Sequence, residues 1–195
     1  MQRTDTKRLT WLSLLIALLI IQTFVPGIGY IPIGPMQATI IHITVIIGAI
    51  LFGPKDGAIL GLSWGILRLI KAFIMPDVMS PVFMNPMISV LPRFLVGWLS
   101  GLIYVACKRK INPPLSQVMT GVIGSLINTV AVLGLIYVFE AESYAEILNI
   151  PTAALLATLG GVVATNGILE AIVSGVLTPI ITTPLTKIIQ KINVN

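Results

Sequence analysis

Charged side chains are scarce in this sequence. They make up 10% of its 195 residues, whereas soluble domains carry about 25%. Hydrophobic residues make up 56% of the chain, and the mean hydropathy is +1.00. A chain of this composition has too little polar surface for an ordinary soluble domain. Because a helix that crosses a membrane needs about 20 mainly apolar residues, the sequence predicts an all-α membrane protein with several such helices.

Cysteine and histidine each occur once, as Cys107 and His42. One cysteine cannot form an internal disulfide, and together with one histidine it cannot make a zinc site. The sequence also lacks the Gly-x-x-x-x-Gly-Lys-Ser/Thr loop that binds nucleotide phosphates. Glu170 is the only acid within an apolar run. These absences disfavour an enzyme, and they predict that this chain itself holds no metal, nucleotide or other cofactor.

Proline and glycine divide the apolar sequence into six segments, because both residues tend to end helices. The predicted membrane helices cover residues 9–25, 37–52, 57–74, 86–107, 115–139 and 162–189. Residues 140–160 form a longer connection, in which we expect a short surface helix from Thr152. No alternation of apolar and polar residues predicts a strand. The whole chain, residues 1–195, therefore reads as one six-helix transmembrane domain.

Small residues recur every fourth position on two of these helices. They are Gly57, Gly61 and Gly65 on one helix, and Gly97 and Gly101 on the next. Such spacing allows the backbones of two membrane helices to approach closely, so we expect these helices to pack against each other or against neighbours.

The charges of the loops predict the orientation of the chain. With six helices, both termini and two of the loops share one side of the membrane. Bases dominate that side, against two acids, Asp5 and Asp56. The bases are Arg3, Lys7, Arg8, Lys55, Lys108, Arg109, Lys110, Lys187 and Lys191. The opposite loops carry only acids, which are Asp77, Glu140, Glu142 and Glu146. Since loops rich in lysine and arginine stay inside, both termini are predicted to be cytoplasmic.

Three cations lie within the apolar runs: Arg68, Lys71 and Arg93. A charged side chain inside the bilayer costs several kcal/mol unless it faces a partner, the protein interior or water. At about 1.5 Å per helical residue, further polar residues fall in the same layer, away from the cytoplasm. They are His42, Asn128, Asn166 and Glu170. Trp64 shares a helix face with Arg68 and Lys71. Because three bases here meet one acid, the layer predicts a site for an anionic ligand.

Each of these residues also has a simpler interpretation. Glu170 could pair with Arg68 or Arg93 and only hold helices together. Lys71 could extend outward to the headgroups, and His42 could be a buried core residue. Asn128 could bridge two helices without touching a ligand.

The loop between the first two predicted helices is apolar, uncharged and rich in glycine and proline. Its characteristic residues are Gly29, Tyr30, Pro32, Gly34 and Pro35. This composition suits a lid that closes over the mouth of a pocket, although burial among lipid headgroups would explain it as well. Residues 75–85 have a similar character.

Several stretches resemble one family of membrane proteins. They are residues 29–35 and 39–48, the turn Phe52-Gly53-Pro54-Lys55 with the residues around it, and residues 85–93. Together they are similar to the substrate-binding S component of an energy-coupling factor (ECF) vitamin transporter, a type of ABC importer. The stretch 85–93 most resembles the pantothenate-type branch. The resemblance extends over nearly the whole chain.

The resemblance implies a six-helix subunit, multi-pass in a bacterial plasma membrane, that binds one vitamin near the outer face beneath the first loop. Its implied partners are a transmembrane coupling protein, the T component, and two cytoplasmic ATPases, the A components. These ATPases bind the ATP and Mg that the chain itself has no site for. In the family, an Ala-x-x-x-Ala motif on the first helix contacts the coupling protein. Here the matching positions are Ser13 and Ala17.

The resemblance favours pantothenate, which has one carboxylate, an amide and two hydroxyls. Arg93 or Arg68 would hold the carboxylate. The other candidate binding residues are His42, Trp64, Lys71, Asn85, Asn128, Asn166 and Glu170. A vitamin precursor such as hydroxymethylpyrimidine or pyridoxine is the alternative within the class, with Glu170 as the key group and Trp64 stacked on the ring. Outside the class, a stand-alone ion-coupled carrier or channel and a structural subunit without ligand remain open.

Overall fold

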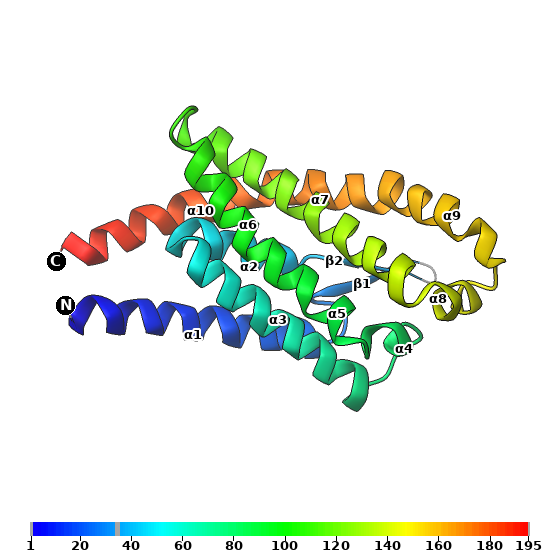
Figure 1. The fold of residues 1–195 in the computed structure, drawn as a ribbon. Coiled ribbons are helices and arrows are strands. Elements are labelled where there is room, and N and C mark those ends of the chain that lie inside the picture. The colour runs from blue at the N-terminus through cyan, green and yellow to red at the C-terminus, as the bar shows by residue number, and fades with distance from the viewer. Residues whose placement is uncertain (1, 34–35, 195) are drawn as a thin grey trace.

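The computed structural model describes residues 2–33 and 36–194. It is an elongated bundle of helices with a small hairpin at one end (Figure 1). The helices are α1 Gln2–Phe24, α2 Ile41–Phe52, α3 Pro54–Ile74, α4 Ser80–Phe83, α5 Pro86–Ser89, α6 Leu91–Cys107, α7 Pro113–Phe139, α8 Ala141–Ile147, η1 Thr152–Ala154, α9 Leu155–Val162, η2 Val163–Gly167 and α10 Ile168–Val194. The strands are β1 Tyr30–Ile33 and β2 Met36–Thr39. Both chain ends lie at the end of the bundle opposite α4 and α8 (Figure 1).

Among the described residues, five helical runs are long and apolar enough to cross a membrane. They are Thr6–Phe24, Pro54–Ile74, Pro86–Cys107, Pro113–Phe139 and Thr152–Ile189. Large apolar side chains on their outer faces are exposed, as expected of surfaces that contact lipid. The sixth predicted helix, α2, has 12 residues. At 1.5 Å per residue it is about 18 Å long, shorter than the roughly 30 Å hydrocarbon core.

The short helix α2 is the centre of the bundle. Ten of its residues, from Ile41 to Ile50, are buried, and α2 packs against α1, α3, α6, α7 and α10. A helix that is apolar on every side is stable only when neighbours surround it. Gly53, at φ 96°, ends α2 and lets the chain turn directly into α3 at Pro54.

Glycines bring α3 and α6 into close contact, as their spacing predicted. A Cβ atom on Gly61 would collide with the main chain of Arg93, and one on Gly65 would lie 2.7 Å from the Cα of Val90. Gly57 and Gly97 face each other in the same way. This close approach matters for function, because it places Arg68 of α3 and Arg93 of α6 in neighbouring positions.

The prediction that the chain has no strand is wrong. Residues 30–33 and 36–39 form an antiparallel pair in which Tyr30 lies opposite Thr39, so α2 begins at Ile41 instead of residue 37. Proline at position 32 disfavours helix, and the β-branched Thr39 favours an extended backbone. Four-residue strands are too short to show a convincing alternation in the sequence.

Other boundaries also differ from the predictions. Helices α3 and α7 begin at Pro54 and Pro113, since proline is accepted at the first position of a helix. The predicted helix 86–107 is divided at Val90 into α5 and α6. The expected surface helix from Thr152 runs directly into the last membrane helix. A π-helical turn at Val163–Gly167 lies where the two join, and such turns often mark functional sites.

An ion pair ties α1 to the start of α3. Two guanidinium nitrogens of Arg8, Nε and Nη2, donate to the carboxylate of Asp56, which is fully buried. A two-pronged contact of this kind is among the strong ion pairs. It fixes the position of α1 at the end of the bundle that carries both termini.

Candidate functional site

A cavity of about 100 Å³ lies at the hairpin end of the bundle. This space exceeds the roughly 10–15 Å³ that a single water needs and approaches the roughly 150 Å³ of an engineered cavity that holds benzene. Its lining comes from many elements of the fold. The lining residues include Tyr30, Thr39, Arg68, Met79, Phe83, Arg93, Asn128, Thr129, Val132, Leu133, Ile136, Tyr144, Val162, Asn166 and Glu170.

Arg93, in the first turns of α6, is 3% exposed. Its Nη1 donates to the Ile88 carbonyl at 2.6 Å, and its Nε has no hydrogen-bond partner within residues 2–33 and 36–194. No acidic side chain of the described residues forms an ion pair with it. A buried cation without a counter-ion is unfavourable unless an anion joins it. Arg93 is therefore a cation of the cavity lining that suits an anionic ligand.

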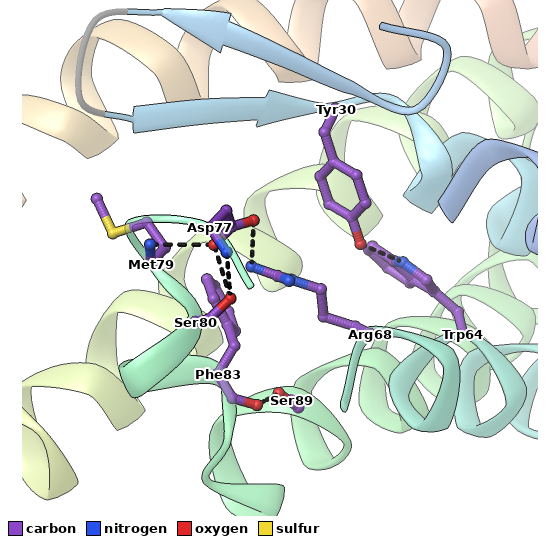
Figure 2. Close-up of polar contacts among 8 residues, drawn as sticks. All are labelled: Tyr30, Trp64, Arg68, Asp77, Met79, Ser80, Phe83 and Ser89. Carbon is purple, nitrogen blue, oxygen red and sulfur yellow. Dashed lines mark hydrogen bonds and ion pairs between the residues drawn. The ribbon is translucent and has the colours of Figure 1, made fainter. Parts of the chain in front are cut away.

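Arg68 is equally buried, at 1% exposure, but it has a carboxylate partner. Its Nη2 lies 3.4 Å from Oδ2 of Asp77. The other oxygen of Asp77 accepts from the Met79 amide and the Ser80 hydroxyl (Figure 2). The expected surplus of three bases over one acid was therefore too large, because the loop that follows α3 returns an acid to the site.

Aromatic rings surround these cations. The Phe83 ring lies 4.2 Å from the Arg68 guanidinium carbon and 5.2 Å from that of Arg93. Tyr30 covers Arg68 at 5.4 Å, and its hydroxyl accepts from the Trp64 indole at 3.3 Å (Figure 2). Ring faces attract cations, most strongly where water is excluded. The rings therefore stabilise the two guanidinium groups without neutralising them.

Glu170 occupies the α10 side of the cavity and is held by two donors. Its Oε1 accepts from the backbone N–H of Thr39 at 2.8 Å, and its Oε2 accepts from the Thr129 hydroxyl at 3.3 Å. Among the described residues, Glu170 forms no ion pair with Arg68 or Arg93, although it attracts Arg93 electrostatically. Glu170 instead attaches the hairpin to α10 and α7.

Neutral groups complete the lining. Asn128 is 4% exposed, and its Oδ1 has no hydrogen-bond partner. Asn166 lies in the π-helical turn, one turn before Glu170. An apolar wall is formed by Val132, Leu133 and Ile136 of α7. Burial raises the pKa of the nearby Tyr144 phenol, so Tyr144 presents a neutral ring to the cavity.

The structure brings six of the sequence-predicted residues to one cavity. They are Tyr30, Arg68, Arg93, Asn128, Asn166 and Glu170. Thr39, Thr129 and Asp77 were missed, because threonines are common in apolar helices and Asp77 falls in a loop. The closeness of Asp77 to Arg68 along the chain was the one signal in the sequence that could have found it.

Four other candidates lie outside the described lining. Trp64 is fully buried behind Arg93, 5.1 Å from the guanidinium carbon, where it cannot stack on a ligand ring. Lys71 is half-buried with its Nζ over the Tyr30 ring at 4.3 Å. Asn85 caps α5 through the Met87 amide and donates to Glu140. His42 is fully buried within α2, and neither ring nitrogen has a hydrogen-bond partner among the described residues.

The predicted lid corresponds to the hairpin. Gly29 is buried just before β1, and Tyr30 reaches the cavity from β1. Pro32 lies in β1 opposite Gln37, whereas Gly34 and Pro35 are outside the described residues. The predicted coupling residues Ser13 and Ala17 lie on the exposed side of α1, on a helix that contributes no described residue to the cavity lining.

Comparisons with known proteins agree with this architecture. A solved structure described as the S component for biotin from an ECF-type ABC transporter has the same fold, with a TM-score of 0.58 over 92% of each chain at 17% identity. Two curated relatives are named as pantothenate transporters. The relative from Leuconostoc mesenteroides is 34% identical, and the match covers 98% of this chain and 98% of that protein. The one from Lactococcus lactis subsp. cremoris is 29% identical, over 96% of this chain and 97% of that protein.

The model of one protein family matches residues 7–182 of the chain. That family is described as the ECF transporter, substrate-specific component. Its members are membrane transport subunits and not enzymes, in agreement with the cavity, the long apolar helices and the absence of a nucleotide-binding motif from the sequence. The chain belongs to the family of substrate-specific components of ECF transporters.

Proposed function

We propose that this chain binds pantothenate as the S component of an ECF importer in a bacterial plasma membrane. The observation that carries the proposal is Arg93, a buried cation of the cavity lining that forms no ion pair with an acid among the described residues. Pantothenate offers one carboxylate for it, and its amide and hydroxyls suit Asn128, Asn166 and Glu170. The names of the two curated relatives support the same substrate.

The membrane arrangement is part of the proposal. Six helices, including the short α2, cross the bilayer, and both termini are cytoplasmic, in keeping with the bases of that side. The cavity then faces the exterior beneath the hairpin. A T component and two A components bind the subunit at the cytoplasmic side and through Ser13 and Ala17 of α1. Hydrolysis of ATP by the A components drives release of the vitamin inside.

Alternatives within the class have less support. A flat aromatic vitamin precursor would find aromatic rings in the lining, at Tyr30, Phe83 and Tyr144, but it would bring no carboxylate to Arg93. A neutral ligand would leave the charge of Arg93 unmatched in the cavity.

The proposal is tested with the purified subunit and two small molecules. Isothermal titration calorimetry should show tight binding of pantothenate and at least 100-fold weaker binding of pantothenol, in which the carboxylate is replaced by a hydroxymethyl group. The loss follows because a buried charged group is left unpaired when its partner is removed. Equal affinity for the two would refute the anionic site, and binding of neither would refute the choice of vitamin.

A further inference from the structure

The cavity has a positive and a negative side. Arg93 is contributed by α6 and Glu170 by α10. Both helices pack against α7 but make few contacts with each other, and packed helices lie about 8–10 Å apart. The two charges line the same cavity from different helices, and they attract each other electrostatically without forming an ion pair.

The other charges near the cavity change this polarity little. Asp77 forms an ion pair with Arg68, whose Nε and Nη1 have no hydrogen-bond partner among the described residues. Lys71 lies over the Tyr30 ring and is not among the described lining residues. Among the described lining residues, Arg93 is the cation that attracts Glu170, and it does so from another helix without forming an ion pair. One anionic group of a ligand would pair with Arg93, whereas a second anionic group placed beside Glu170 would meet a negative charge.

Glu170 still has capacity to accept hydrogen bonds. A carboxylate offers about four acceptor positions, and the Thr39 amide and the Thr129 hydroxyl occupy one on each oxygen. Those two contacts also fix the carboxylate in place. A hydroxyl of the ligand would complete this set, whereas an anion in the same place would be repelled, and like charges placed together at a binding surface cost several kcal/mol.

We propose that Glu170 determines specificity, accepting a ligand hydroxyl at the end away from Arg93 and excluding any ligand with a second anionic group. The cavity then selects hydroxylated monocarboxylates and rejects their phosphate esters. This inference rests on the proposed function for the orientation of the ligand, with its carboxylate at Arg93.

The test compares pantothenate with its phosphate monoester on the primary hydroxyl, by calorimetry on the purified subunit. The wild-type protein should bind the ester at least 100-fold more weakly than pantothenate. Glu170→Gln should weaken pantothenate binding, because the ligand hydroxyl loses a carboxylate acceptor, and it should reduce the preference for pantothenate over the ester at least tenfold. The glutamine keeps an acceptor for the Thr39 amide, so the hairpin remains attached while the charge is lost. Glu142→Gln, the same change at an exposed position of α8, is the matched control and should leave the preference unchanged.

A second variant adds charge instead of removing it. Asn166→Lys places a cation one turn from Glu170 and should improve binding of the ester at least tenfold, even if Glu170→Gln does not fold. Comparable wild-type affinities for pantothenate and the ester would overturn the inference alone. So would an unchanged preference in both variants. If wild-type protein binds no pantothenate at all, the proposed function fails first.

Discussion

Replacing Arg93 with alanine should remove most of the affinity for pantothenate. In the structure the guanidinium is 3% exposed, makes one hydrogen bond to the Ile88 carbonyl and has an unpartnered Nε. Truncating one partner of a buried charged pair costs about 2–5 kcal/mol, since the other charge stays buried without a partner. At about 1.4 kcal/mol per factor of ten, the expected loss is roughly 30- to 4,000-fold.

Two further substitutions separate charge from geometry. Arg93→Lys keeps the charge but loses the planar fork that binds both carboxylate oxygens, so it should recover little of the loss. Lys71→Ala is the matched control, because Lys71 is also a cation of this layer but lies outside the described lining. Its affinity should stay within about threefold of the wild type.

Calorimetry with pantothenate measures all three variants, after size-exclusion chromatography has shown that each remains monodisperse. An Arg93→Ala protein that binds within threefold of the wild type would move the carboxylate to Arg68. If Arg68→Ala also binds normally, the anionic substrate itself is refuted.

Three other substitutions test separate parts of the molecule. Asp77→Asn should tighten pantothenate binding about three- to tenfold, because Arg68 loses its internal partner while the Met79 and Ser80 contacts can persist. Weaker binding would instead show that the charge of Asp77 is needed to hold the loop. Ala17→Trp should keep vitamin binding by the isolated subunit but abolish ATP-dependent uptake and co-purification with the ATPases, since a large side chain prevents close helix approach. Normal transport would exclude this face of α1 as the docking surface. Arg8→Ala should destabilise the subunit by about 1–3 kcal/mol, because Asp56 is left buried without its partner, and an unchanged thermal midpoint in detergent would contradict this.

Much of the fold could be predicted from local sequence. The apolar runs located the long helices, because the hydrophobic content of about 20 successive residues decides whether a helix suits a membrane. Gly53 with Pro54 marked the sharp turn between α2 and α3. The glycine spacing on α3 and α6 indicated their close packing, since a glycine every fourth residue lies on one side of a helix.

The hairpin and the continuation of α9 into α10 were not predictable in this way. A strand of four residues gives almost no periodic signal. It is stable here because tertiary contacts hold it, among them the bond between the Thr39 amide and Glu170, 131 positions apart in the chain.

The sequence by itself determined that buried cations and a lone acid had to be accommodated within the membrane layer, because composition and helix length fix depth. Only the tertiary structure decided which of those charges are matched. It paired Arg68 with Asp77, left Arg93 without an ion pair in the described part of the chain, and attached Glu170 to the hairpin. Charge pairing depends on distances of a few ångströms between side chains, and the packing of several helices sets those distances, whereas sequence spacing orders residues along one helix only.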